Sequence, residues 1–478
     1  MTGVSSAYAP AAELQDRVPM PRGRRRTELL MLVFAVAVVL LAYASVGFGL
    51  NGKLPPGLLA YGLTFAGLVL AAHLAVRRLA PWADPLLLPL AALLNGLGIV
   101  MIYRLQESGR GGNPGSVIST LAPTATAYQV VYSAVGLAVF VALLAVIRQP
   151  RVLQRYTYTL GAIALVLLAI PALLPASMSS VNGAKVWIII GRFSIQPEEF
   201  AKLALAVFFA GYLVAKRDVL ALAGRRVIGI DLPRARDLGP VLLAWAASLL
   251  ILIFETDIGT SALFFGMFVV MIYIATQRTS WLLIGILLFV FGSYAASKLS
   301  THVGERFNIW LHPFAGQNPS HNAYQLVQGL EGMGFGGILG SGLGHGQPYF
   351  TPLVQSDFIV TAFGEELGLA GLMALLLVFG LIVQRGLRAA IGVTDPFAKL
   401  LAAGLSFVLA LQIFVIVGGV TGLIPLTGIT TPFLSQGGSS LIASWALIAL
   451  LMRVSDTARQ PTPQPIQDEG MTQVVRTG

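Results

Sequence analysis

Long apolar segments dominate this chain of 478 residues. A helix needs about 20 mostly apolar residues to cross a bilayer. Hydrophobic residues make up 56% of the sequence and charged residues only 11%, a balance outside the range of soluble globular domains. The sequence therefore predicts an all-α polytopic membrane protein with about 12 transmembrane helices, at residues 29–50, 57–76, 85–103, 127–147, 158–176, 197–215, 239–256, 258–276, 280–297, 357–384, 398–420 and 439–453.

The charge distribution predicts the orientation of these segments. Most of the 31 Lys and Arg residues fall on one side if the N-terminus is cytoplasmic. We therefore expect both termini to be cytoplasmic, in a multi-pass protein of the cell membrane. The net charge of +10 then lies mostly beside anionic lipid and needs no nucleic-acid partner.

The polar segments complete the predicted organisation. Residues 1–28 and 454–478 lack apolar periodicity and are expected to be disordered cytoplasmic tails. Residues 298–356 form an expected extracytoplasmic loop that is too long to be a simple connector. The chain has no cysteine, which excludes disulfides and cysteine nucleophiles.

Carboxylates occur at the edges of the apolar segments, although a charge at the bilayer centre costs roughly 2.5–3.5 kcal/mol. In the predicted orientation Glu199, Lys202, Asp257 and Asp357 all lie in the outer half. Glu199 and Lys202 are three positions apart, which lets them pair on one helix face. Taken singly, such residues are as readily explained as ion pairs or helix-start acids. Their clustering favours a water-filled cavity that opens outward, in which a carboxylate with a raised pKa would suit a general base.

Two glycine-rich stretches were considered as functional elements. The GSGLGHG run (340–346) lacks the GK[ST] ending of a phosphate-binding P-loop. The stretch TGLIPLTGITTPFLSQGGSSL (421–441) is either a turn followed by a helix start capped by Ser439 and Ser440, or an unwound segment that lines the cavity. We favour the unwound segment.

Five motifs in order resemble those of the SEDS family (shape, elongation, division and sporulation), which includes RodA, FtsW and SpoVE. They are NGAKVWIIIGRFSIQPEEFAK (182–202), ETDIGTS (255–261), NAYQLVQGL (322–330), SDFIVTAFGEELGLAG (356–371) and IPLTGITTPFLSQGGSSL (424–441). The resemblance implies a ten-helix core over residues 85–453. Residues 29–84 would then be two additional N-terminal transmembrane helices.

The resemblance also implies an activity. Such proteins are peptidoglycan glycosyltransferases that polymerise lipid II by an inverting reaction outside the cytoplasmic membrane, beside a class B penicillin-binding protein with transpeptidase activity. The catalytic acid of the family falls on Asp357, the cavity acids on Glu199 and Asp257, and the family lysine on Lys202. A RodA-like role in elongation is preferred to an FtsW-like role in division.

Some positions depart from the family pattern. Val186 replaces an arginine, with Lys185 beside it, Leu353 stands where an acid is usual, and Gln436 replaces a tyrosine. Positive charge for the leaving diphosphate would come from a cationic side chain or from a divalent cation, Mg or Mn, held near Asp357 and Asp257. The expected substrate-binding cavity comprises Glu199, Lys202, Asp257, Lys185, Arg306, Tyr324, Gln328, Glu366, Gln436 and Ser439.

Two other functions fit parts of the pattern. Twelve spans with buried acids and a broken helix also suit a secondary transporter or a lipid II flippase. A structural scaffold for the penicillin-binding protein would instead leave the cavity residues without a role. The absence of an internal repeat and the crowding of polar residues in the outer third favour the enzyme.

Overall fold

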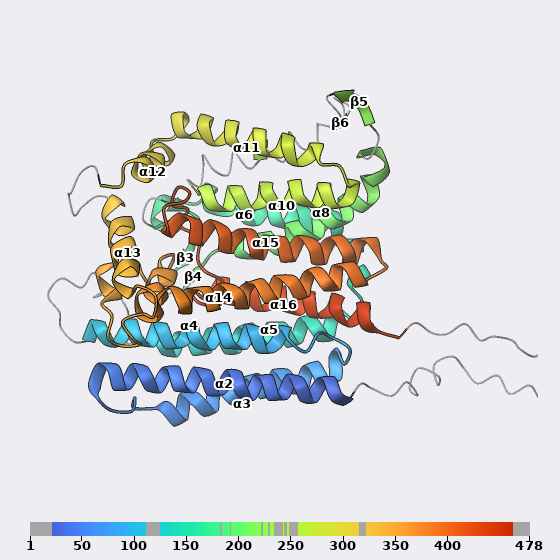
Figure 1. Ribbon diagram of the computed structural model, residues 1–478. Helices are drawn as coiled ribbons and strands as arrows, with labels where there is room; N and C mark the ends of the chain where they lie inside the picture. The colour runs from blue at the N-terminus through green and yellow to red at the C-terminus, as the bar shows by residue number, and fades with distance from the viewer. Residues whose placement is uncertain are drawn as a thin grey trace, which may run out of the picture.

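The structure is a bundle of long helices that lie roughly side by side (Figure 1). The computed structural model describes residues 22–110, 125–181, 184–191, 193–220, 223–227, 230–233, 242, 246–247, 257–314 and 322–461. The helices are α2 (Arg22–Asn51), α3 (Leu58–Leu79), α4 (Leu87–Arg110), α5 (Ala125–Val146), α6 (Thr157–Leu173), α7 (Ala176–Ser179), α8 (Glu198–Leu220), α10 (Ile258–Thr276), α11 (Ser280–Leu299), α12 (Thr301–Leu311), α13 (Asn322–Gly336), α14 (Ile359–Gly392), α15 (Pro396–Val420) and α16 (Gly438–Arg459), with the 3-10 turns η2 (Pro150–Tyr156) and η4 (Pro348–Phe350).

Short antiparallel strand pairs are the other regular elements. They are β1 (Ser180–Val181) with β2 (Ala184–Lys185), β3 (Ile188–Ile190) with β4 (Phe193–Ile195), and β5 (Ala223–Val227) with β6 (Ile230–Pro233). None of them joins a larger sheet. The predicted all-α class is therefore confirmed.

Within the described residues, ten helical segments are long and apolar enough to cross a membrane. They comprise α2 to α5, α6 with the preceding turn η2, α10, α11, and α14 to α16. Helix α8 occupies the sixth predicted span but carries Glu198, Glu199 and Lys202 in its first turns. The predicted span at 239–256 falls outside the described residues except for three positions.

The two ends of the bundle differ. Helices α12 and α13 cover one end, here called the loop end, whereas α2 begins and α16 ends at the other end (Figure 1). The predicted loop 298–356 is therefore partly helical, since it contains α12, α13 and η4. The helices α4, α10, α15 and α16 are the most buried of the candidate spans and form the centre of the bundle.

Two predicted boundaries need correction. Helix α2 begins at Arg22 and α16 continues to Arg459, so residues 22–28 and 454–459 are helical rather than parts of disordered tails. Buried polar contacts stabilise these extensions: Arg25 donates to the carbonyl oxygen of Ala83 at 2.7 Å, and Asp456 accepts from the backbone N–H of Trp82 at 2.8 Å. Charge alone suggested a tail because the partners are distant in sequence.

The additional N-terminal helices form a hairpin on the side of the bundle. Helix α2 packs on α4 and α3 packs on α5, as the blue ribbons show (Figure 1). Inside the hairpin, the buried Glu28 carboxylate pairs with Arg25 and lies 2.7 Å from Nδ1 of His73. The hairpin is thus fixed to the core by packing and internally by a buried polar network.

Helix α14 is interrupted at Gly368, where φ is 67° and ψ is −172°. The turn after α13 fits against this break: the N–H of Ser341 donates to the Glu365 carbonyl oxygen at 3.0 Å, and the N–H of Leu369 donates to that of Gly337 at 2.9 Å. The predicted span at 357–384 is one continuous helix, so the break is a correction to it. The residues before Gly368 therefore form a helical segment that is separate from the spanning helix.

We predict that Gly368→Ala destabilises the protein. A Cβ atom at this position would lie 2.3 Å from the Gly340 backbone nitrogen, and the positive φ disfavours any side chain. The backbone conformation alone costs roughly 1–3 kcal/mol, to which the clash adds. A lower thermal unfolding midpoint of the detergent-purified variant would show this effect.

Gly380→Ala is the matched control in the same helix. Its backbone is helical and a Cβ atom there meets nothing within 4 Å, so the change should be neutral or stabilising. Equal midpoints for the two variants would contradict the assigned role of the break.

Candidate active site

Asp357 lies in the turns that precede α14, at the loop end of the bundle. Its partly covered side chain lines a small pocket whose other walls come from the end of α15 and from residues 426–429. Burial raises the pKa of Asp357 to about 6, while the charge of Arg306 and the backbone N–H groups of residues 357 and 358 oppose this rise. A carboxyl group with this pKa can exchange a proton near neutral pH.

Arg306 of α12 contacts the wall of the same pocket. Its guanidinium donates to the carbonyl oxygens of Thr427 at 3.0 Å and of Leu426 at 3.4 Å. Gly428 leaves room for it, because a Cβ atom there would lie 3.6 Å from the Arg306 Nη2 atom. The structure thus brings two predicted residues together, Arg306 from the long loop and Asp357 from the SDFI motif.

A second polar cluster lies at the start of α8. Glu199 and Lys202 are both buried and form an ion pair, as their spacing predicted. Lys202 also donates to the side-chain oxygen of Gln412 in α15 at 3.0 Å, and the Thr430 hydroxyl donates to Glu199 at 3.2 Å. Lys202 is therefore occupied by protein partners and acts here as a structural cation.

Asp257 caps the N-terminus of α10. Its Oδ1 accepts from the backbone N–H groups of Gly259 at 2.8 Å and Thr260 at 3.1 Å. The Thr260 hydroxyl lies 2.9 Å from Asp257 Oδ2 and also 2.9 Å from Glu198 Oε2. Through Thr260, the cap of α10 is joined to the first turn of α8.

The segment 424–437 connects these groups and is here called the connecting segment. It is not helical, as the sequence analysis favoured. Thr430 contacts Glu199, Thr427 contacts Arg306, and the Ser435 hydroxyl donates to the carbonyl oxygen of Ser356, next to Asp357. Its side chains at 427 and 429 pack against Gly259 at the start of α10. Asp357, Arg306, Glu199, Lys202 and Asp257 therefore surround one irregular segment.

Gln436 and Ser439 follow this segment. The N–H of Gln436 donates to the Gln355 carbonyl oxygen at 2.8 Å, which fixes the chain before Asp357. The Ser439 hydroxyl oxygen accepts from the N–H of Gln196 at 3.0 Å. Both predicted residues thus border the site, with backbone or hydroxyl contacts that hold its walls together.

The remaining predicted cavity residues are placed less directly. Tyr324 and Gln328 lie on α13, where the Gln328 amide donates to Glu331 at 2.8 Å, and Lys185 lies half-buried on β2. Glu366 instead pairs with the buried Arg104 of α4 at 2.7 Å and accepts from the N–H of Gly344 at 3.1 Å. The contacts of Glu366 assign it to a separate cluster beside the additional hairpin, away from the connecting segment.

Several site residues were not among the predicted ones. Thr427, Thr430 and Gln412 hold the charged groups in place. Gln412 carried a usable signal, since it is an isolated amide in an otherwise apolar span. The described residues contain no group of three or more His, Asp or Glu side chains that could hold a metal ion, so the predicted divalent cation stays a prediction.

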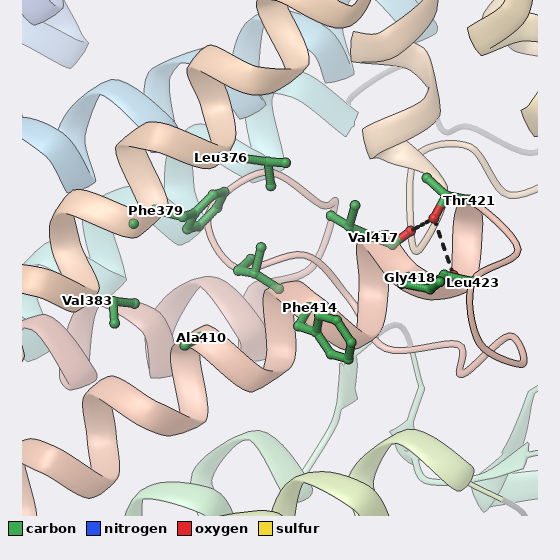
Figure 2. Close-up of a pocket in the computed structure, with 11 residues that line it drawn as sticks. Leu376, Phe379, Val383, Ala410, Phe414, Val417, Gly418, Thr421 and Leu423 are labelled. Carbon is green, nitrogen blue, oxygen red and sulfur yellow. Dashed lines mark hydrogen bonds between the residues drawn. The ribbon is translucent and has the colours of Figure 1, made fainter.

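An apolar groove runs between α14 and α15 and is separate from the polar site. Its volume is about 350 Å³, and its walls include Phe379, Val383, Phe414 and Leu423 (Figure 2). Thr421 lies at one end, where its hydroxyl donates to the carbonyl oxygen of Val417 at 2.7 Å. Without a titratable side chain, the groove can accommodate hydrocarbon but contributes no acid or base.

Fold and site define a multi-pass membrane protein with a carboxylate-bearing site at one end of its helix bundle. The profile of the family described as cell cycle protein, which covers FtsW, RodA and SpoVE, matches residues 84–460. The chain belongs to this family, which confirms the resemblance seen in the motifs.

Individual relatives agree with this assignment. The chain is 48% identical over 447 residues to the peptidoglycan glycosyltransferase RodA of Mycobacterium tuberculosis, covering 93% of this chain and 92% of the relative. It is 48% identical over 443 residues to that of Mycobacterium leprae, with the same coverage. It is 34% identical over 280 residues to the stage V sporulation protein E of Bacillus subtilis, covering 58% of this chain and 73% of the relative.

Solved structures share the fold. A chain from a structure described as the structural coordination of polymerization and crosslinking by a peptidoglycan synthase complex matches with a TM-score of 0.61 at 25% identity, covering 79% of this chain and 99% of that chain. RodA of Thermus thermophilus matches with a TM-score of 0.54 at 24% identity, covering 80% of this chain and 98% of that chain. Both matches leave about a fifth of the present chain unaccounted for.

We predict that Asp357→Asn stabilises the protein above pH 6. Because the folded-state pKa of about 6 exceeds the ordinary value of 3.8, ionisation of Asp357 disfavours the folded state as the pH rises between these values. The penalty above pH 6 is up to about 3 kcal/mol and is absent below about pH 4. The unfolding midpoint of the variant should exceed that of the wild type at neutral pH, and the gap should close on acidification. A gap independent of pH would contradict this explanation.

We predict that Lys202→Met destabilises the protein by about 3–5 kcal/mol, because Glu199 would remain buried without its cation. The double variant Glu199→Gln with Lys202→Met should recover most of the loss, as a double-mutant cycle of unfolding free energies would show. Lys399→Met, at an exposed position of α15, is the control and should have little effect. Additive losses in the double variant would exclude the pair as a coupled unit.

Proposed function

We propose that this protein is a RodA-type peptidoglycan glycosyltransferase that polymerises lipid II into glycan strands for cell elongation. The observation that carries the proposal is Asp357, with a pKa of about 6, in a pocket whose wall Arg306 contacts. The close relatives named peptidoglycan glycosyltransferase RodA support this activity over transport or a scaffold role. Relatives named FtsW match at lower identity, 29–32%, which favours the elongation type over the division type.

The loop end is proposed to face the outside of the cytoplasmic membrane. The excess of Lys and Arg in the segments at the opposite end supports this orientation. Helix α2 begins and α16 ends at that opposite end (Figure 1), so both termini would be cytoplasmic. The site around Asp357 would then meet lipid II after the lipid has reached the outer leaflet.

In the proposed reaction, the 4-hydroxyl of one lipid-linked disaccharide attacks the anomeric carbon of another. A new glycosidic C–O bond forms while the bond from the anomeric carbon to the diphosphate oxygen breaks, and the lipid diphosphate departs with the electron pair. Asp357 accepts the hydroxyl proton. A direct displacement inverts the anomeric configuration, by analogy with inverting glycosidases that use a carboxylate base.

Positive charge stabilises the departing diphosphate. Arg306 is the best-placed cation because it contacts the wall of the Asp357 pocket. Lys202 is buried and bonded to Glu199 and Gln412, so its role is to position the connecting segment. Lys185 is half-buried on β2 and remains a candidate for the diphosphate.

Three partners follow from the proposal. Lipid II is the donor and the acceptor, and a class B penicillin-binding protein would crosslink the product. The structural match to a chain of a peptidoglycan synthase complex that coordinates polymerization and crosslinking supports such a partner. The surrounding membrane lipid is the third partner, and the divalent cation near Asp357 and Asp257 stays a prediction.

The test is polymerisation of purified lipid II in detergent with the transpeptidase present. We predict that Asp357→Asn lowers the rate at least about 100-fold, in the range that general base catalysis contributes. The wild-type rate should fall about tenfold per pH unit below pH 6, as Asp357 becomes protonated. Asp395→Asn, at the N-cap of α15 and the opposite end of that helix, is the control and should keep its activity. Full activity of Asp357→Asn would refute the assignment.

A further inference from the structure

A second cavity, here called the hairpin pocket, lies where the additional hairpin meets the core. Its volume is about 290 Å³, near the lower limit of the roughly 300–1,000 Å³ typical of ligand sites. Leu50 and Asn51 at the end of α2 form one wall, the last turns of α4 another, and residues 344–349 the third. Since the family profile begins at residue 84, the pocket depends on residues that the profile does not include.

The walls of the hairpin pocket are held by close backbone packing. A Cβ atom at Gly49 would lie 2.4 Å from the Leu343 carbonyl oxygen, and one at Gly344 would lie 3.0 Å from that of Val46. Gly344 also has a φ of 87°. The GSGLGHG run that is not a P-loop therefore has a structural explanation: its glycines let the loop fit against α2.

Buried charges fix the floor of the pocket. Arg104 is 1% exposed, pairs with Glu366, and donates to the Gly346 carbonyl oxygen at 2.7 Å. Glu365 accepts from the N–H of Gln347 at 2.5 Å. A floor held in this way needs little ordering when a ligand binds, which favours affinity.

The chemistry of the lining selects against anions. Arg104 is neutralised by Glu366, and Glu365 adds a further carboxylate behind the wall. A phosphate or diphosphate would therefore meet unfavourable charge. The side chains of Asn51, His345 and Gln347 offer donors and acceptors, and Tyr349 adds an aromatic ring that contacts Phe350 at a centroid distance of 4.9 Å. Two side-chain amide groups and an aromatic ring suit a neutral ligand with many hydroxyl groups.

The hairpin pocket is linked to Asp357 through the chain. The wall residue Tyr349 precedes Asp357 by eight positions. Glu365 and Glu366, which hold lining residues from behind, belong to the helical segment that starts just after Asp357. The Gln325 amide donates to the Pro352 carbonyl oxygen at 2.9 Å and braces the chain between the two sites. One continuous stretch, residues 349–366, thus contributes to both cavities.

We propose that the hairpin pocket is a carbohydrate subsite that holds a neutral sugar of the glycan strand away from the reacting bond. The identity of the sugar rests on the proposed function, whereas the carbohydrate class rests on the pocket. A strand held there stays near Asp357 between additions, so the subsite would lengthen the product.

The direct test is binding of the neutral tetrasaccharide of N-acetylglucosamine to the purified full-length protein. We expect Asn51→Trp, which places a large ring at the rim of the pocket, to weaken binding about tenfold or more. Lys53→Trp, at an exposed position outside the lining, should bind as the wild type does. Should Asn51→Trp fail to fold, Gln347→Ala tests another wall of the pocket and should also weaken binding.

Equal binding by the wild type and a folded pocket variant would overturn the proposal, as would no binding by the wild type. Inorganic diphosphate is the second probe, and a loss of diphosphate binding in Asn51→Trp would also overturn it, because it would mark an anion site. With lipid II, Asn51→Trp should give shorter strands than Lys53→Trp does. If the wild type fails to polymerise lipid II, the proposed function fails, but the tetrasaccharide experiment still decides the subsite.

Discussion

The fold depends on satisfying buried charges inside an otherwise apolar bundle. A carboxylate or an ammonium group in this setting is stable only with a partner of opposite charge or with hydrogen bonds. The connecting segment supplies many of these contacts, because its chain is not helical and exposes both hydroxyl and carbonyl groups to its neighbours. Through Thr430 it supports Glu199, and through the Thr427 carbonyl it holds Arg306. Irregular backbone at this depth is tolerated because it is surrounded by protein.

Interrupted helices give the loop end its function. The break at Gly368 ends the short helical segment that follows Asp357 and lets the loop after α13 bond to the exposed backbone. Asp257 likewise begins a helix at the site, since α10 starts directly after it. Helix ends and helix breaks place polar groups at positions where an uninterrupted helix would bury apolar side chains. The uninterrupted middle parts of the spans, by contrast, form the apolar core that fixes the positions of these polar groups.

Local sequence signals predicted much of this arrangement. The apolar lengths located the spans, and the spacing of Glu199 and Lys202 predicted their ion pair. The glycine-rich stretch after α15 was rightly favoured as an unwound segment. The family motifs identified Asp357, and the structure gives it a raised pKa and a cationic neighbour.

Contacts between distant residues could not be predicted. Arg104 and Glu366 are 262 positions apart, so the separate cluster around Glu366 was invisible and this residue was grouped with the catalytic cavity. The helical extensions at Arg25 and Asp456 were not predicted for the same reason, because their partners lie in the 80–83 turn. The hairpin pocket is a further case, since it forms only where α2 meets a loop 290 positions later in the chain.

The polar site lies at the loop end of the bundle. We propose that water reaches this site from outside the cell. The chain has no cysteine, so a single introduced thiol reports its own position. Ser194→Cys, exposed on β4 just before the site, and Thr394→Cys, exposed at the opposite end before α15, should be compared in intact cells with a maleimide that cannot cross membranes. The account predicts labelling of Ser194→Cys in intact cells and of Thr394→Cys only after permeabilisation. The reverse pattern would contradict it.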